Sequence, residues 1–120
     1  MSTPAPAKSS PLTTHVLDTA LGKPAAGVSV VLERAGEEGY TQVGAGITNA
    51  DGRVTDLIED DDFTSGVYLL HFDTGSYFEI TKRECFYPEV AVLFQIKDPD
   101  AHHHVPLLIS PFGYSTYRGS

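Results

Sequence analysis

The chain has 120 residues, of which 41% are hydrophobic and 20% charged, and its formal net charge is -8. These values predict one globular domain with a single core. No cluster of lysine or arginine interrupts the acidic balance, which excludes a nucleic-acid-binding surface and an anionic-membrane surface. The single cysteine, Cys85, excludes an internal disulfide and favours a reducing compartment, the cytoplasm.

The first eleven residues, MSTPAPAKSSP, contain much proline, alanine and serine but no apolar run of the kind that a secretory signal requires. We therefore expect a disordered leader over residues 1–11 and one folded domain over residues 12–120. No segment approaches the roughly 18 to 20 apolar residues that would span a bilayer.

From Leu12 onward, short β-favouring runs alternate with turns rich in Gly, Pro, Asn and Asp, a rhythm typical of an antiparallel sandwich. The first run surrounds His15. The later runs are GVSVVLER (27–34), YTQVGAGIT (40–48), RVTDLI (53–58), GVYLLHFD (66–73), EVAVLFQIKD (89–98), HHHVPLLIS (102–110) and about residues 114–118. Turns are expected at residues 36–39, 49–52 and 98–101.

Alternating apolar residues predict which side of these strands is buried. Val28, Val30 and Leu32 share one face of the second run, and the run 89–98 alternates in the same way. Only the stretch TGSYFEITKREC (74–85) has helical character, enough for two to three turns. The prediction is an all-β fold, a two-sheet β-sandwich of seven to eight strands with one short helix.

Three of the five histidines are consecutive, and the two-residue period of a strand separates them. His103 is expected to point to the core side with Val105, whereas His102 and His104 point to the opposite side. His104 is the best functional candidate of the three, because it stands within the strand on the less apolar face. A solvated turn edge is the alternative for His102 and His103.

The remaining candidates are ambiguous when each is taken alone. His71 lies inside the run 66–73 and is expected to be a hydrogen-bonded structural histidine. His15 stands at the start of the first run, and Arg53 follows the NADG turn directly. Each of these two residues can be either a solvated side chain or a catalytic group.

A zinc site is the main metal alternative, since His15, His102 and His104 would supply three imidazoles if their strands meet. No cysteine or glutamate stands at a recognisable ligand spacing, so we predict no metal. The acidic run EDDD (59–62) lacks the spaced oxygen ligands of a calcium loop and is expected to be solvated. The sequence also lacks a nucleophile elbow and a phosphate-binding loop, which leaves histidine acid/base chemistry or simple binding.

Four segments together carry a family resemblance. They are THVLDTALGKPAAGV (14–28), NADGR (49–53), FYPEV (86–90) and HVPLLISPFGYSTYRGS (104–120). They closely resemble the 5-hydroxyisourate hydrolases, the transthyretin-related enzymes of purine breakdown, over about residues 12–120. The most specific element is the terminal YRGS, which the hormone-carrying transthyretins lack.

The resemblance implies a transthyretin-like sandwich of two four-stranded sheets. It implies a homotetramer, a dimer of dimers, with active sites in clefts at the dimer–dimer interface. The implied reaction is hydrolytic opening of 5-hydroxyisourate to 2-oxo-4-hydroxy-4-carboxy-5-ureidoimidazoline in urate degradation, without a metal or organic cofactor.

The resemblance also implies the site residues. The catalytic residues would be His15, Arg53, His104 and Ser120, and the substrate-binding residues Arg53, Tyr117 and Arg118. The family typically has tyrosine between the two histidines that precede V-P-L-L, where this chain has His103. Because that position faces the core side, we expect the change to alter packing rather than the reaction.

A mechanism follows from these roles. Histidine suits both proton transfers of a hydrolysis because its pKa lies near working pH, and we expect His15 and His104 to lie close together and titrate as a pair. Arg53 would stabilise the developing negative charge, and Ser120 would act through its hydroxyl or its α-carboxylate. The main alternative is a non-catalytic transthyretin-type carrier of a small aromatic ligand, and the second is a structural sandwich domain.

Overall fold

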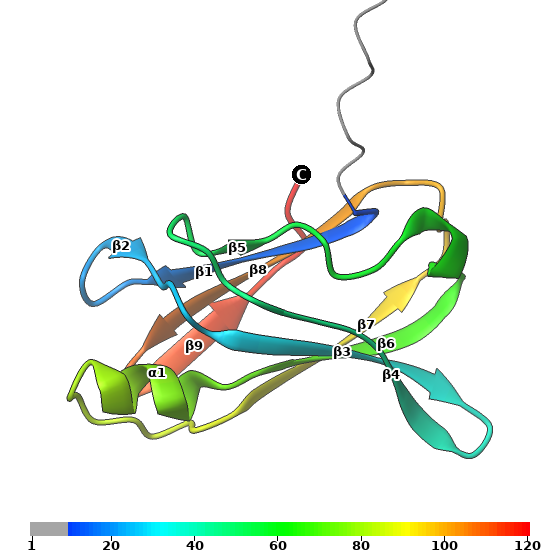
Figure 1. The fold of residues 1–120 in the computed structure, drawn as a ribbon. Helices are drawn as coiled ribbons and strands as arrows, with labels where there is room; N and C mark the ends of the chain where they lie inside the picture. Colours follow the sequence, from blue (N-terminus) through cyan, green and yellow to red (C-terminus); the bar gives the residue numbers. More distant parts are fainter. Residues whose placement is uncertain (1–9) are drawn as a thin grey trace, which may run out of the picture.

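The computed structural model describes residues 10–120 (Figure 1). Most of the expected leader, residues 1–9, lies outside this range. Ser10 and Pro11 belong to the folded part: the Ser10 hydroxyl donates a hydrogen bond to the Ile58 carbonyl at 2.6 Å, and the Pro11 carbonyl accepts one from the His103 backbone at 2.8 Å. The folded domain thus includes two residues that the sequence assigned to the leader.

The regular structure of the described chain is mostly strands, with one α-helix and one short 3-10 helix (Figure 1). The strands are β1 (Leu12–Asp18), β2 (Lys23–Pro24), β3 (Ser29–Gly36), β4 (Gly39–Ile47), β5 (Arg53–Val54), β6 (Gly66–Phe72), β7 (Val90–Ile96), β8 (His103–Ser110) and β9 (Gly113–Thr116). The helices are η1 (Asp60–Asp62) and α1 (Thr74–Ile80). The predicted all-β class with one short helix is confirmed.

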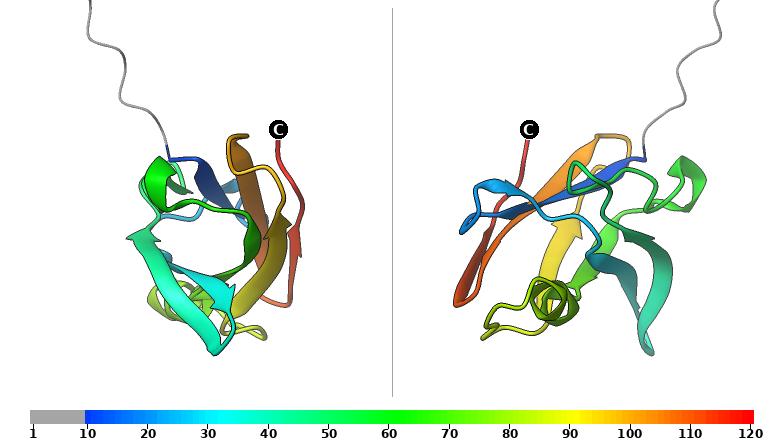
Figure 2. Two further views of the ribbon diagram at one scale, coloured as in Figure 1. Left: turned by 90° about the vertical axis from the view of Figure 1, so that its right-hand side faces the viewer. Right: turned by 60° about the vertical axis from the view of Figure 1, so that its left-hand side comes forward.

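The strands form two sheets that face each other (Figure 2). The first sheet has the order β2-β1-β8-β9, with β5 also paired to β1, and the second sheet has the order β4-β3-β6-β7. Strands β1 and β8 are parallel, whereas the other pairs are antiparallel. The first sheet has one strand more than the resemblance implied, because the two-residue strands β2 and β5 both pair with β1. Segments so short carry no hydrophobic period, and β2 was not predicted.

The core between the sheets contains alternate residues of each strand. Val28, Val30 and Leu32 are fully buried, and Val90 and Ile96 at the two ends of β7 are 1% exposed. Both predicted alternations are confirmed. The largest fully buried side chains are Tyr68, Phe72, Phe78, Leu12, Leu32, Leu70, Ile96, Leu107, Ile109, Val16, Val28 and Val30.

A buried carboxylate ties α1 to the first sheet. Asp18, at the end of β1, is 0% exposed and accepts hydrogen bonds from the Tyr77 hydroxyl at 2.7 Å and from the Arg83 guanidinium. Burial alone would raise the pKa of Asp18, but the bonds from Arg83 and Tyr77 lower it below its usual value. The helix ends at Ile80, before the predicted end at residue 85, and Lys82 adopts a left-handed φ of 57°.

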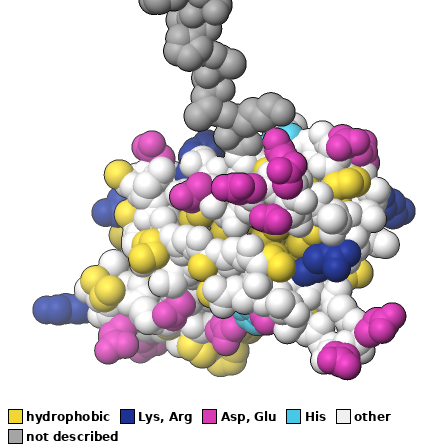
Figure 3. Space-filling view, turned by 45° about the vertical axis from the view of Figure 1, so that its right-hand side comes forward, with side chains coloured by type: hydrophobic (Ala, Val, Ile, Leu, Met, Phe, Trp, Pro, Cys, Tyr) yellow, Lys and Arg dark blue, Asp and Glu magenta, His cyan; other side chains and the backbone are white. Residues whose placement is uncertain are grey.

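The surface agrees with the acidic composition. Figure 3 shows Asp and Glu side chains spread across one face of the molecule, with fewer Lys and Arg among them. The EDDD run is exposed as expected, and three of its residues form η1 rather than an irregular loop. Neither helix in the part of the chain described is long and apolar enough to cross a membrane.

Candidate active site

His15 lies on the outer face of the first sheet because successive strand residues point to opposite sides. Thr14 and Val16 point into the core and are 0% exposed, while His15 between them is half-buried on the other face. His15 pairs with Arg53 of β5 on one side and with Pro106 of β8 on the other. The first sheet therefore sets a histidine directly beside an arginine.

The NADG turn is what places Arg53 opposite His15. The Asn49 side-chain oxygen accepts a hydrogen bond from the Arg53 backbone N–H at 3.1 Å. Gly52 has a φ of +74°, and an added Cβ there would lie 2.4 Å from the Val16 carbonyl oxygen. Glycine is required at this position, and the turn packs directly against β1 as a result.

The three consecutive histidines separate as the strand period predicts. His103 is 8% exposed on the core side, where its Nδ1 lies 2.8 Å from the Ala101 carbonyl oxygen. His104 is half-buried on the outer face, and His102 is exposed. The ring centroids of His15 and His104 are 6.5 Å apart, with 29° between the ring planes. The structure thus brings together the two histidines expected to share acid/base work.

Burial and the Arg53 charge lower the pKa of both rings. For His15, loss of solvent lowers the pKa most and Arg53 lowers it further, while a hydrogen bond with the Asp51 backbone opposes them. For His104, burial, Arg53, His15 and His102 lower the pKa in that order of size. Both pKa values fall below 6.5, so at pH 7 each imidazole has a nitrogen lone pair that can accept a proton.

The C-terminal segment leaves the first sheet after Thr116 and returns to it at Gly119. β9 pairs with β8 as far as Thr116 opposite Leu107, and Gly119 forms an isolated bridge opposite His104 in the same register. Pro106 lies between these two pairs and has no backbone N–H to donate. The Thr116 hydroxyl instead donates to the Pro106 carbonyl at 2.8 Å. The last strand therefore ends at Thr116, two residues before its predicted end.

Gly119 packs directly on the His104 ring. Its N–H donates to the His104 carbonyl at 2.8 Å, and an added Cβ would lie 2.6 Å from the ring carbon Cδ2. Only glycine permits this contact without moving the ring. Tyr117, Arg118 and Ser120, the other residues of YRGS, are exposed around it. The chain end is thus anchored to His104 through backbone atoms, and its three side chains are available to a ligand.

The expected site residues line an open surface rather than an enclosed pocket. His104, Tyr117 and Arg118 lie on one side of a cleft of about 280 Å³, and β7 forms its other wall. His15 and Arg53 lie outside this cleft, on the outer face of the first sheet. A second surface is needed to enclose a small molecule between all five residues.

Sequence reasoning missed Thr13. This residue is 8% exposed, and its hydroxyl oxygen lies 2.8 Å from Nδ1 of His104 and 3.1 Å from Nε2 of His102. Strand alternation places Thr13 on the same face as His15, and the sequence alone could have shown this. Its contact with His104 depends on the parallel pairing of β1 with β8, and no sequence pattern reveals that pairing.

Two further expectations concern histidines and metals. His71 hydrogen-bonds to Glu33 and Glu89 on the second sheet, away from the other candidates, as expected of a structural histidine. Within residues 10–120, no group of three or more His, Cys, Asp or Glu side chains is arranged to hold a metal ion. The three-imidazole arrangement of the zinc alternative is therefore not formed by these residues.

Known proteins resemble this chain over most of its length. A profile of the HIUase/Transthyretin family matches residues 12–119. A relative from Salmonella dublin named 5-hydroxyisourate hydrolase is 49% identical over 109 residues, which are 91% of this chain and 80% of the relative.

Solved structures show the same likeness. That of Klebsiella pneumoniae 5-hydroxyisourate hydrolase is 39% identical, covers 94% of this chain and 100% of the other, and has a TM-score of 0.78. Sea bream transthyretin in complex with thyroxine is 33% identical, covers 91% and 94% of the two chains, and has a TM-score of 0.85. The resemblance indicated by the sequence motifs is confirmed, and this chain belongs to the HIUase/Transthyretin family.

Proposed function

We propose that this chain hydrolyses 5-hydroxyisourate to 2-oxo-4-hydroxy-4-carboxy-5-ureidoimidazoline, a step of urate degradation. One observation carries the proposal: the ring centroids of His15 and His104 lie 6.5 Å apart on one sheet face, and Arg53 pairs with His15 there. The name of the Salmonella dublin relative supports the choice of substrate.

The reaction is the hydrolysis of a cyclic amide. The oxygen of water bonds to the ring carbonyl carbon while a base takes one of its protons. The carbon–nitrogen bond then breaks, the nitrogen takes a proton from an acid, and the ring opens to a carboxylate and a ureido group. His15 and His104 share these proton transfers: a neutral imidazole accepts the proton of water, and the imidazolium formed in this way is the acid that protonates the leaving nitrogen.

The positive and terminal groups complete the site. Arg53 binds the substrate oxygens and stabilises the negative charge that develops on the carbonyl, a contribution of about 3 to 4 kcal/mol if it equals that of other oxyanion donors. Ser120 contributes its hydroxyl and α-carboxylate. Tyr117 and Arg118 bind the substrate from the exposed end of the chain.

Closure of the site requires a partner surface. We propose a homotetramer, a dimer of dimers, in which a second copy covers the outer face of the first sheet and encloses the substrate. The reaction uses water and protein groups alone, without a cofactor. A cytoplasmic enzyme agrees with the one free thiol, Cys85.

The carrier alternative has its own support in the 33% identity to sea bream transthyretin, which was solved with thyroxine. A channel that only holds an aromatic ligand has no use for two neutral imidazoles, an arginine and a polar chain end on one surface. These residues favour the hydrolase.

The test is an absorbance measurement. 5-Hydroxyisourate is made from urate with urate oxidase, and its ultraviolet absorbance is followed after the chain is added, with and without a chelator. We expect rapid loss of the signal, at a rate proportional to protein concentration and unchanged by the chelator. Decay at the rate seen in buffer alone would reject the hydrolase.

A further inference from the structure

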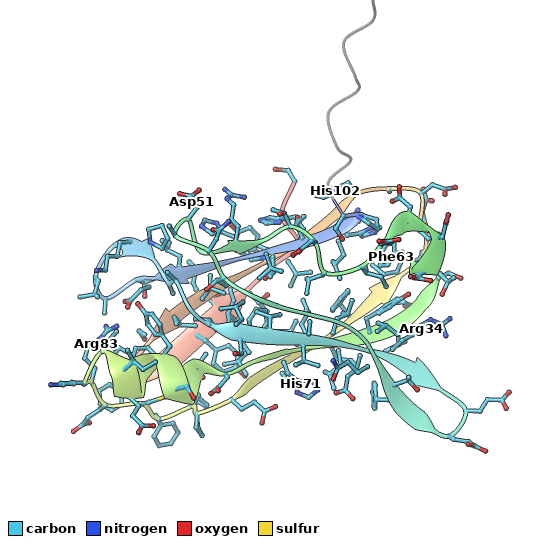
Figure 4. The ribbon with its side chains drawn as sticks, viewed as in Figure 1. Arg34, Asp51, Phe63, His71, Arg83 and His102 are labelled. Carbon is cyan, nitrogen blue, oxygen red and sulfur yellow. The ribbon has the colours of Figure 1, made fainter. Side chains whose placement is uncertain are left out.

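The Thr13 hydroxyl lies between two imidazoles at the edge of the candidate site. Its oxygen is 2.8 Å from Nδ1 of His104 and 3.1 Å from Nε2 of His102. Thr13 and His104 are paired residues of β1 and β8, so the backbone fixes this contact. His102 is exposed, and Figure 4 shows it at the outer edge of the first sheet. The Thr13 oxygen thus links half-buried His104 to exposed His102.

A hydroxyl has one hydrogen, which limits how three groups can bond in a row. If Thr13 donates to His102, its oxygen accepts from Nδ1–H of His104, and Nε2 of His104 keeps a lone pair. If Thr13 donates to His104, the hydrogen of neutral His104 sits on Nε2. The two arrangements give His104 opposite abilities, since only the first lets Nε2 accept a proton.

The proposed reaction favours the first arrangement. Only that arrangement leaves Nε2 of His104 with a lone pair that can accept a proton from water. It also uses the one Thr13 hydroxyl hydrogen for the 3.1 Å contact with His102, while the Thr13 oxygen accepts at 2.8 Å from Nδ1 of His104.

We propose that Thr13 is a positioning residue that keeps the hydrogen of His104 on Nδ1, leaves Nε2 as the proton acceptor, and connects His104 to His102 for proton release. Its catalytic meaning rests on the proposed hydrolysis. When Nε2 takes a proton from water, the Nδ1 hydrogen moves to the Thr13 oxygen and the hydroxyl hydrogen moves to Nε2 of His102. His104 becomes neutral again with its hydrogen on Nε2, and His102 carries the positive charge. The three groups together then hold one proton more than before, the one taken from water.

The neighbours of His104 favour transfer of the positive charge to His102. An imidazolium at His104 would stand near the Arg53 guanidinium and the His15 ring, both of which disfavour a positive charge there. His102 is exposed, so water solvates a charge placed on it. When the Nε2 hydrogen of His104 passes to the leaving nitrogen, the proton on His102 returns through Thr13 to Nδ1. His104 is then ready for the next turnover.

The first experiment reads the position of the hydrogen without substrate. Nitrogen NMR of the histidine-labelled chain at about pH 8 distinguishes a protonated Nδ1 from a protonated Nε2. We expect the Nδ1–H form in the natural chain and in Thr13→Ser, and a shift toward Nε2–H in Thr13→Val, which keeps the shape but lacks the hydroxyl. An Nε2–H form in the natural chain would overturn the proposal.

The second experiment measures hydrolysis. Thr13→Val should lower kcat by about 10- to 100-fold, as removal of groups that orient a functional histidine does, with KM little changed. Thr13→Ser should stay near the natural rate. His102→Ala should also lower kcat, added imidazole should restore it, and Thr13→Val/His102→Ala should be no slower than Thr13→Val alone. Equal losses in the Ser and Val variants, or additive losses in the double variant, would contradict the relay.

The two experiments separate this inference from the proposed function. If the natural chain does not accelerate loss of 5-hydroxyisourate, the proposed function fails. The NMR result then still decides whether Thr13 sets the proton of His104.

Discussion

The two outer faces of the sandwich hold histidines in opposite electrostatic surroundings. On the second sheet, His71 lies between two carboxylates: its Nε2 bonds to Glu33, and its Nδ1 is 2.7 Å from Glu89. Burial alone would lower the pKa of His71, but the bonds to Glu89 and Glu33 outweigh it and raise the pKa. His71 therefore favours the charged form.

On the first sheet, the largest charge effect on His15 and His104 comes from a cation, Arg53, and the Asp51 carboxylate opposes it only weakly at His15. Burial and Arg53 lower the pKa of both His15 and His104. Figure 4 shows the two regions on opposite sides of the molecule, with His71 outside one sheet and His102 outside the other. Burial lowers the pKa of the histidines on both faces, so it does not explain the difference between them. The difference comes from the charged neighbours, which favour the protonated form of His71 and the neutral form of His15 and His104.

Removal of the chain end should have the largest effect on the first sheet. Deletion of Tyr117–Ser120 removes the Gly119 contact with the His104 ring and the terminal carboxylate. We expect the shortened chain to keep its oligomeric state in light scattering but to lose hydrolysis entirely. Activity in the shortened chain would show that the terminus is dispensable and that the strand residues alone form the site.

Substitution of single histidines should separate the two faces. His15→Asn or His104→Asn should lower turnover by about a hundredfold or more with the fold intact by circular dichroism, because each removes an acid/base group. His71→Asn is the matched control on the second sheet and should hydrolyse at the natural rate. Comparable losses of activity at all three positions would mean that the charges around a histidine do not distinguish catalytic from structural histidines.

A smaller change tests how closely the chain end controls the ring. Gly119→Ala puts a methyl group against Cδ2 of His104 and should lower kcat about tenfold by turning the ring from its preferred position. Gly113→Ala, in the same segment, is the control, since its added Cβ meets only the Ser110 hydroxyl at 3.7 Å. Equal rates in the two variants would show that the ring tolerates displacement.

The smallest expected effect is on the pH dependence of stability. A raised pKa means that His71 stabilises the fold fully below the unfolded value of 6.5 and loses that contribution as pH rises through its folded pKa. His71→Asn should therefore cost more unfolding free energy at about pH 6 than at about pH 9 in urea titrations. His15→Asn should do the reverse: its pKa is lowered, so the natural His15 disfavours the folded state as pH falls below 6.5.

Short-range patterns in the sequence predicted a large part of this structure. The alternation along β8 placed His103 on the core side and His104 on the outer face, because period two is a property of the strand itself. The NADG signature likewise predicted the turn before Arg53, since its Asn and Gly satisfy local requirements.

Features that depend on strand partners were not predictable in this way. The break in the last strand arises because Pro106, on a neighbouring strand, cannot donate a hydrogen bond. The contact between Thr13 and His104 arises from the register of two strands. Each of these features needs the partner strand to be known, which a pattern along one segment does not contain.

The parallel pairing of β1 with β8 also has a kinetic consequence. The hydrogen bond between Thr13 and His104 joins residues 91 positions apart, so a loop of nearly the whole described chain must close before the two strands meet. Contacts of such high contact order form slowly, because a long loop must close first. Recovery of hydrolysis after dilution from denaturant should consequently follow the slowest folding phase, and the site itself serves as a reporter of completed folding.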